Sequence, residues 1–408
     1  MATAAAVLAL PAAGAMASAA APATLHAART QTTTLISRAR DGGIPNGAST
    51  NPAISGDSRY ARVIAFESDA SDLVAGDSNG MKDVFAVKRA GSYANNGGSW
   101  HGGDAILLSR GRNRQPANGP SFHAAVDGAY RSAPRCVAFL SAASNLVKGD
   151  TNGVVDAFLS RGPGRTPRRV SLSGRRQSTV PTTDVAVSGD CSRIAFVTGG
   201  RLYTRAHRKV KSLATNGAAA NPSFANGETS DLVFDAGGDV YLSAGGTGKP
   251  QKVAGGGRNP GYNALKRRVL AYEKYAGGHW QIAWRELGKG GEHIASSAGS
   301  RLGNGDSRNP SVANSGYYIG FETEADNLGT NAAQQAKDDN DSPDTYLYTA
   351  VRDLTLVQSV EDYGVPLDGG GRNPAVSYYA NYFVFDSPAP LGGPFGQRQI
   401  FMRWLGAV

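Results

Sequence analysis

The sequence predicts an all-β fold, a single closed β-propeller of seven four-stranded blades. The first observation is a hydrophobic triplet with an aromatic residue in third place, which recurs at 64–66, 137–139, 194–196, 232–234, 270–272, 319–321 and 383–385. The second is a proline-containing segment upstream of each triplet. These segments lie about 40 to 70 residues apart, which is the repeat length of propeller blades.

Each repeat is interpreted as four strands, A to D. In the first repeat we expect strand A at 51–55, strand B at 60–68, strand C at 83–88 and strand D at 105–110. Short alternating runs between clusters of Gly, Asn, Asp and Pro are typical of antiparallel strands and turns. The strand B segments are almost entirely apolar, as a strand covered on both faces requires. The third repeat is weakly marked, so a six-bladed ring is the alternative.

The two ends of the chain predict how the ring closes. The last repeat has candidate strands at 374–378, 382–386 and 399–404 and then lacks a strand D. Near the N-terminus, Leu35-Ile36-Ser37-Arg38 nearly repeats Leu107-Leu108-Ser109-Arg110 from strand D of the first repeat. We therefore expect 35–38 to complete the last blade beside 399–404, which would remove the open sheet edges. The propeller would then occupy residues 31–408.

Residues 1–30 are interpreted as a leader. They are rich in Ala, with a small apolar centre at 7–10, and resemble a secretory signal without its basic start. A disordered Ala-rich leader or a misplaced start is the alternative. We expect an exported protein, extracellular or in the cell envelope. No later segment approaches the roughly 18 apolar residues of a membrane span. Export permits a disulfide between Cys136 and Cys191, and a free buried pair is the alternative.

Charge and motif content limit the classes of function. The formal charge of +9 and the pI near 9.5 allow attraction to polyanions or acidic envelope polymers, but the charge is dispersed, so we favour an ordinary solvated basic surface. The basic clusters at 165–176 and 205–211 lack interleaved aromatic residues, so we expect no nucleic-acid binding. The histidines show no metal-binding spacing. We therefore expect a non-enzymatic binding scaffold, with a propeller-type hydrolase or lyase as the alternative.

Two repeats carry a motif that resembles a known family. The strings are Ser55-Gly56-Asp57-Ser58-Arg59 with Ile64-Ala65-Phe66, and Ser188-Gly189-Asp190 with Arg193-Ile194-Ala195-Phe196. Both resemble the S-x-D-G-R-x-[IV]-A-F pattern of TolB-type propeller repeats, and 145–158 is similar to a version common in exported bacterial proteins. The resemblance covers residues 35 to the end and is degenerate in repeats 4, 5 and 7. It implies a propeller scaffold and no particular substrate.

An Arg-Asn-Pro triplet opens strand A in three consecutive repeats, which gives the candidate ligand-binding residues Arg258, Asn259, Arg308, Asn309, Arg372 and Asn373. Strand A lines the channel of a propeller, so these residues should face its mouth, beside the long B–C loops of repeats 6, 7, 1 and 2. A guanidinium fork suits carboxylate or phosphate. Alternatively, Asn-Pro shapes the turn and each Arg pairs with a nearby acid. We expect a monomer that binds a protein, peptide or cell-envelope glycan on the face carrying the B–C and D–A loops.

Three acidic loops precede strand C, which gives the candidate metal ligands Asp77, Asn79, Asp83, Asp150, Asn152, Asp156, Asp338, Asn340 and Asp344. The D-x-N-G-x-x-D spacing of the first two resembles the calcium loops of integrin-type propellers, because oxygen ligands around a glycine turn can converge on a hard cation. Asp239 holds the final position in repeat 4 with no such loop before it. Two interpretations therefore stay open, calcium or structural Asx turns, and no other cofactor is expected.

Overall fold

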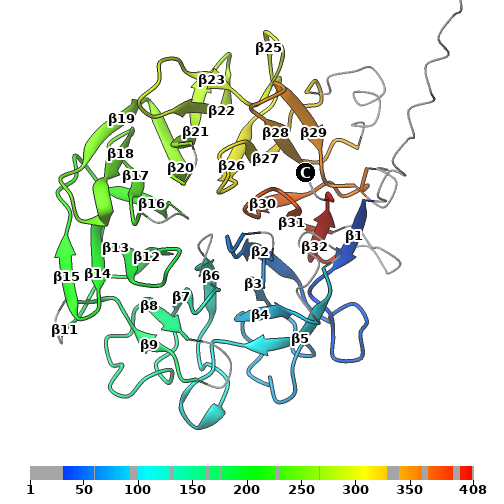
Figure 1. Cartoon of the computed structure of the whole chain (residues 1–408). Helices are drawn as coiled ribbons and strands as arrows, with labels where there is room; N and C mark the ends of the chain where they lie inside the picture. Colours follow the sequence, from blue (N-terminus) through cyan, green and yellow to red (C-terminus); the bar gives the residue numbers. More distant parts are fainter. Residues whose placement is uncertain are drawn as a thin grey trace, which may run out of the picture. The chain divides into compact units, whose positions relative to one another are not determined.

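The computed structural model describes residues 31–58, 60–91, 100–128, 133–161, 165–173, 176–225, 229–265, 267–328, 340–360, 366–388 and 396–406. These residues form seven antiparallel sheets of four strands each, arranged in a ring (Figure 1). The predicted seven-bladed β-propeller is confirmed, and the six-bladed alternative is wrong because the third repeat forms a full blade. Within the described ranges, no helix is long and apolar enough to cross a membrane.

The first four blades follow the chain in order. Blade 1 consists of β2 (Ser49–Ile54), β3 (Val63–Ser68), β4 (Asp83–Arg89) and β5 (Gly102–Leu107). Blade 2 consists of β6 (Ser121–Val126), β7 (Val137–Ser141), β8 (Asp156–Ser160) and β9 (Arg168–Arg169). Blade 3 consists of β12 (Thr182–Val187), β13 (Arg193–Thr198), β14 (Arg201–Ala206) and β15 (Lys209–Ser212). Blade 4 consists of β16 (Ala219–Phe224), β17 (Leu232–Ala236), β18 (Asp239–Ser243) and β19 (Gln251–Gly255).

The remaining blades complete the ring. Blade 5 consists of β20 (Gly257–Asn263), β21 (Val269–Ala276), β22 (His279–Glu286) and β23 (His293–Ile294). Blade 6 consists of β26 (Ser307–Val312), β27 (Tyr318–Thr323), β28 (Asp344–Thr349) and β29 (Leu354–Val357). Blade 7 consists of β30 (Arg372–Val376), β31 (Tyr382–Ser387), β32 (Gln399–Trp404) and β1 (Thr32–Leu35). Between blades lie two hairpins, β10 (Leu172–Ser173) with β11 (Arg176–Gln177) and β24 (Ser297–Ala298) with β25 (Arg301–Leu302), and the 3-10 turn η1 (Arg112–Arg114). A second 3-10 turn, η2 (Ala244–Gly246), lies within blade 4, between β18 and β19.

The hydrophobic core lies between the blades. Each of the buried apolar clusters combines residues of two neighbouring blades, for example Phe66 of blade 1 with Tyr382 of blade 7. The innermost strands also contact one another around the ring, in the order β2, β6, β12, β16, β20, β26, β30 and back to β2. The second strand of each blade is therefore covered on both faces, which explains its almost continuous apolar sequence.

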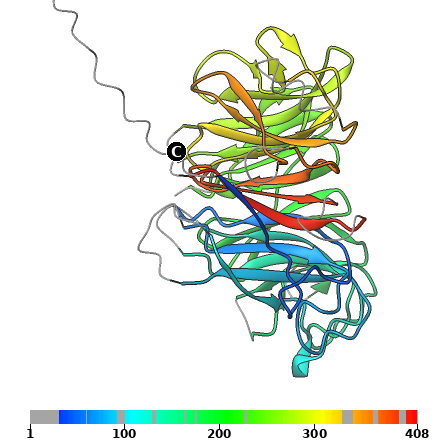
Figure 2. The same ribbon diagram turned by 90° about the vertical axis from the view of Figure 1, so that its right-hand side faces the viewer.

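The N-terminal strand is the fourth strand of blade 7. β1 pairs antiparallel with β32, with Thr32 opposite Trp404 and Leu35 opposite Phe401 (Figure 2, blue beside red). The strand therefore begins three residues before the expected position at 35. Ser37 accepts the N–H of Ile400 and donates to the Gln399 side chain, as Ser109 accepts the N–H of Val84 and donates to Asp83. The repeated Leu-x-Ser-Arg string thus makes the same contacts in both blades.

The two cysteines are bonded to each other. Cys136 precedes β7 in blade 2 and Cys191 precedes β13 in blade 3, and their sulfur atoms form a disulfide. Of the two alternatives that the sequence left open, the disulfide is the one found. It joins neighbouring blades that are 55 residues apart in sequence at these positions.

Removing the N-terminal strand should destabilise the whole ring. Deletion of residues 1–40 exposes the edge of β32 and removes Ile36 from the cluster between blades 1 and 7. We expect a marked fall in the melting temperature, measured by calorimetry, whereas deletion of residues 1–30 alone should leave it unchanged. Equal melting temperatures for the two truncated proteins would contradict this role of β1.

Candidate functional site

A β-bulge marks the start of the innermost strand in every blade. The pairing register shifts between residues such as Thr50 and Ala53 in blade 1 and Arg308 and Ser311 in blade 6. At this bulge the backbone adopts positive φ angles at Asn51 (55°), His123 (55°), Asn221 (49°), Asn259 (47°), Asn309 (54°) and Asn373 (52°). Asn is the non-glycine residue best suited to the left-handed region. The Asn-Pro pairs in the sequence therefore encode this bulge.

The bulge turns a main-chain N–H toward the preceding blade, where a carboxylate accepts it. The donor–acceptor pairs are Asn51 with Asp386 (3.0 Å), His123 with Glu67 (2.8 Å), Asn221 with Asp184 (3.2 Å), Asn259 with Asp235 (3.0 Å), Asn309 with Glu273 (3.0 Å) and Asn373 with Glu322 (2.6 Å). We call these carboxylates the inter-blade belt. Hydrogen bonds to an ionised acceptor are stronger than neutral ones, so the belt fixes the geometry of the channel mouth.

The asparagine side chains extend the belt into a ladder. Asn259 Nδ2 donates to Glu273 (2.8 Å) and to Asn309 Oδ1 (3.0 Å), and Asn309 Nδ2 donates to Asn373 Oδ1 (3.3 Å). Asn373 Nδ2 in turn donates to Asp386 (2.7 Å). The predicted Asn residues of blades 5, 6 and 7 are therefore brought together, and their amides form a continuous polar wall.

The three predicted arginines differ in their contacts. Arg258 Nε donates to Glu273 (2.9 Å), and its guanidinium stacks over Trp280 at 3.6 Å from the ring centroid. Arg308 is paired with Asp306 (2.6 Å). Arg372 is exposed, and within the described residues its guanidinium has no hydrogen-bond or ion-pair partner. The arginines thus share a position in the blades, while Arg372 is the one available to a ligand without breaking a contact.

Titratable groups of the mouth are shifted by burial. Burial raises the pKa of Glu322 against the opposing effects of the Asn373 N–H and the Asn309 side chain, with Asp386 adding to the rise. Burial lowers the pKa of His123, and the charges of Asp184 and Glu67 oppose that shift. Because the carboxylates accept main-chain N–H groups, their first role is to hold the blades together.

A cavity of about 260 Å³ lies at the axis beside these bulges. His123, Asn221, Asn259, Tyr262 and Pro310 contribute to its wall, from the innermost strands of blades 2, 4, 5 and 6. A larger hollow, of about 530 Å³, lies at the outer rim, next to the fourth strand of blade 1. The axial cavity is therefore too small for a folded domain and large enough for a side chain, a chain end or a sugar ring.

At the opposite end of the channel, the loops that follow the innermost strands contact one another. A methyl group on Gly56 of blade 1 would lie 2.2 Å from Asn314 Nδ2 of blade 6 and 2.7 Å from Gly128 O of blade 2. Asn314 donates to Gly56 O (3.0 Å), and Gly128 N donates to Gly189 O (2.9 Å). Blades 1 and 6 are not neighbours, so this contact crosses the ring.

The acidic loops have hydrogen bonds typical of structural turns. In blades 1, 2 and 6 the last Asp of the loop (83, 156 and 344) accepts a serine hydroxyl from after the fourth strand. Gln281 and Gln399 hold that position in blades 5 and 7 and accept a serine in the same way. Asn79, Asn152 and Asn340 donate to these Asp residues. Asp338 lies outside the described residues. Whether the loops bind metal stays a prediction.

Sequence reasoning missed the belt carboxylates. Five of them directly follow the aromatic of the recurring triplet: Glu67, Asp235, Glu273, Glu322 and Asp386. Their position directly after the aromatic could have identified them. In the sequence, however, Glu322 and Glu324 are interpreted as ordinary edge or loop residues. The structure instead places Glu322 on β27, where it accepts the Asn373 N–H, and leaves Glu324 exposed.

No protein-family model matches the sequence, and no curated protein matches it significantly. Solved structures with a similar fold include the β-propeller domain of the trilobed protease from Pyrococcus furiosus (TM-score 0.50, 8% identity, 89% of this chain and 95% of that one). They also include TolB from Acinetobacter baumannii (0.39, 14%, 62% and 60%) and an oligogalacturonate lyase in complex with manganese (0.49, 10%, 92% and 96%). The alignment thus spans less than two thirds of that TolB. At such identities the likeness shows the propeller fold alone.

Loss of one belt carboxylate should destabilise the ring. Glu322→Ala leaves the Asn373 N–H without its acceptor, so we expect the free energy of unfolding to fall by about 1.5–3 kcal/mol, the range for hydrogen bonds to charged groups. Glu324→Ala, two residues along the chain, removes an exposed carboxylate and should change it by less than about 0.5 kcal/mol. Denaturant unfolding of both variants makes the comparison, and equal effects would argue against the belt.

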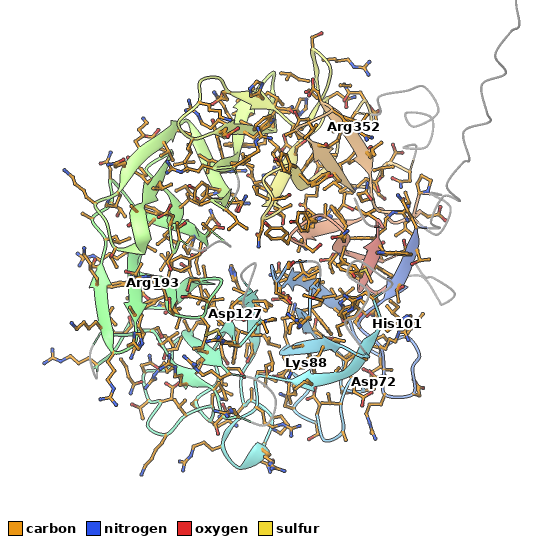
Figure 3. All side chains as sticks on the ribbon, in the orientation of Figure 1. Asp72, Lys88, His101, Asp127, Arg193 and Arg352 are labelled. Atoms are coloured by element: carbon orange, nitrogen blue, oxygen red, sulfur yellow. A yellow bond between two sulfur atoms is a disulfide. The ribbon has the colours of Figure 1, made fainter. Side chains whose placement is uncertain are left out.

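A buried carboxyl group in the loop that follows β6, Asp127, predicts that stability depends on pH. Burial raises the pKa of Asp127 from 3.8 to about 7, and Asp57 adds to the rise; Figure 3 shows Asp127 near the ring centre. Between those values the folded chain keeps a proton that the unfolded chain has released, so stability falls as pH rises through this window, by up to about 4 kcal/mol. Asp127→Asn, whose amide oxygen can still accept the N–H groups of Arg135 and Cys136, should flatten that fall. If Asp127→Asn and the wild-type protein lose stability equally as pH rises, the assignment of this fall to Asp127 is contradicted.

Proposed function

We propose that the protein is an exported, non-enzymatic binding scaffold whose ligand is a protein segment, peptide or cell-envelope glycan. The ligand binds at the channel mouth, on the face that carries the B–C and D–A loops. One observation carries the proposal: the axial cavity and the exposed Arg372, which has no hydrogen bond or ion pair among the described residues, adjoin the same ladder of asparagine amides. Small concave sites with a few fixed polar groups are the usual form of ligand sites.

The chemistry of the wall selects the ligand group. The exposed guanidinium of Arg372 offers N–H donors, while the ladder amides and the belt carboxylates are already engaged in hydrogen bonds within the chain. A carboxylate or a hydroxyl-rich group therefore fits better than a cationic one. The volume of about 260 Å³ admits one such group and excludes a folded partner, so the remainder of the ligand would lie across the loops.

A propeller-type hydrolase or lyase is the second candidate. The observation that favours it is His123, which lies in the cavity wall and feels the charges of Asp184 and Glu67. The main-chain N–H of His123 is itself bonded to Glu67, which gives that carboxylate a structural role. We therefore place binding first, and turnover of any retained ligand distinguishes the two.

Substitution of the arginines tests the ligand site. Peptide and glycan arrays that include acidic members would be probed with the wild-type protein, and retained ligands measured by calorimetry. If Arg372 contacts the ligand, Arg372→Ala should cost about 1.5–3 kcal/mol of affinity with little change in melting temperature. Arg258→Ala and Arg308→Ala should also lower stability, because both residues have partners within the chain.

Arg352→Ala is the matched control, since this exposed arginine lies at the outer edge of the ring (Figure 3). It should leave affinity and stability unchanged. Equal ligand retention by the Arg372→Ala and wild-type proteins would refute the assignment of the ligand site to the channel mouth.

A further inference from the structure

The acidic loops of blades 1 and 2 share one backbone design. Gly76 and Gly149 open them with φ angles of 76° and 73°, and Gly80 and Gly153 follow with 62° and 68°. In each loop the Asn side chain donates to the last Asp and to a main-chain carbonyl, that of Ala117 in blade 1 and that of Ser178 in blade 2. The two loops can therefore be compared position by position.

In blade 2 a cation of the chain itself fills the loop. Arg169 NH1 donates to Asp150 (2.7 Å), to Asp156 (3.1 Å) and to Gln177 Oε1 (2.8 Å). Its NH2 group faces the carbonyl of Gly149 (3.4 Å), which also accepts from Gln177 Nε2 (2.7 Å). The loop thus directs two carboxylates and a carbonyl oxygen at one positive centre, and each of these groups has a partner.

In blade 1 the corresponding positions are apolar. Leu107 pairs with Phe85 as Arg169 pairs with Phe158, so Leu107 replaces the guanidinium. Pro116 precedes Ala117 as Gln177 precedes Ser178, so the supporting amide is replaced as well. Asp77 nevertheless remains. Its side chain is buried, with 7% of the residue exposed. Among the described residues, neither of its carboxylate oxygens accepts a hydrogen bond.

An uncompensated buried carboxylate is costly unless it is protonated or paired. The charge of Arg110 acts on Asp77, although no hydrogen bond joins the two side chains among the described residues. Asp83 lies close enough for the charge of Asp77 to act on it. Both oxygens of Asp77 are covered, so the missing partner has to be small. A bare ion meets this condition, whereas a side chain of another protein does not.

We propose that the blade 1 loop binds a calcium-sized divalent cation between Asp77 and Asp83, at the place that Arg169 occupies in blade 2. The donors are carboxylate oxygens and the Gly76 carbonyl, the counterpart of the Gly149 carbonyl. Oxygen donors on a flexible glycine turn suit Ca²⁺, while zinc prefers His and Cys. The cation balances the negative charge of this loop, which is part of the long B–C connection of blade 1, and stabilises that side of the ring.

The test uses the full chain, freed of metal with a chelator and titrated with CaCl₂ by calorimetry and thermal unfolding. The wild-type protein should take up calcium and melt at a higher temperature with it. Asp77→Asn should remove one equivalent of bound calcium. The control is Asp150→Asn, which removes the ion pair between Arg169 and Asp150 and should lower the melting temperature without changing calcium uptake. Calcium uptake by Asp77→Asn equal to wild type would overturn the proposal, as would no uptake by the wild type.

A second test exchanges the residues that distinguish the acidic loops of blades 1 and 2, and again measures calcium uptake and melting temperature. Leu107→Arg with Pro116→Gln should supply the internal cation, abolish the uptake of one calcium equivalent and raise the melting temperature of the metal-free protein. Arg169→Leu should add one equivalent in blade 2. If instead Arg110 is the partner of Asp77, Arg110→Gln will lower the metal-free melting temperature and calcium will have no effect on the wild type, which contradicts the proposal.

Discussion

At the channel mouth a carboxylate of one blade accepts the main-chain N–H of a left-handed residue in the next blade. The bulge creates that N–H outside its own sheet, and a main-chain donor left without a partner is costly. Side chains alternate along a strand, so the triplet aromatic faces the preceding blade while the following acid faces the next one. Phe66 accordingly packs against blade 7, and Glu67 binds the His123 N–H of blade 2. One short segment of strand therefore builds both the core and the mouth.

The junction between blades 2 and 3 follows another solution. Leu140 occupies the position of the acid in blade 2, and within the described residues no belt carboxylate bridges these two blades. The disulfide between Cys136 and Cys191 joins this same pair of blades. A covalent link limits the separation of the blades in partly unfolded states. The ring thus combines belt carboxylates at its other junctions with a covalent bond at the junction where the described residues include no belt carboxylate.

The fold was predictable because its signals are local and repeated. The triplet, the Asn-Pro starts and the duplicated Leu-x-Ser-Arg string each lie within a few residues. They favoured seven blades over six and identified the closing segment, although not its first residue. The site was less predictable, because its partners come from different blades. Nothing near Glu322 in the sequence points to Asn373, and nothing in the acidic loop of blade 2 points to Arg169 on the fourth strand. For the same reason, the sequence did not decide whether Cys136 and Cys191 are bonded, because they lie in different blades.

The belt also explains why the mouth can serve as a binding surface: its asparagine ladder is held in place before any ligand arrives, which lowers the entropic cost of binding. Amide hydrogen exchange tests this account most directly. If the carboxylates lock the ring, the main-chain N–H groups of Asn259, Asn309 and Asn373 will exchange as slowly as the buried strand amide of Phe321, only through global unfolding. Exchange of these asparagine amides many times faster than that of Phe321 would contradict the account.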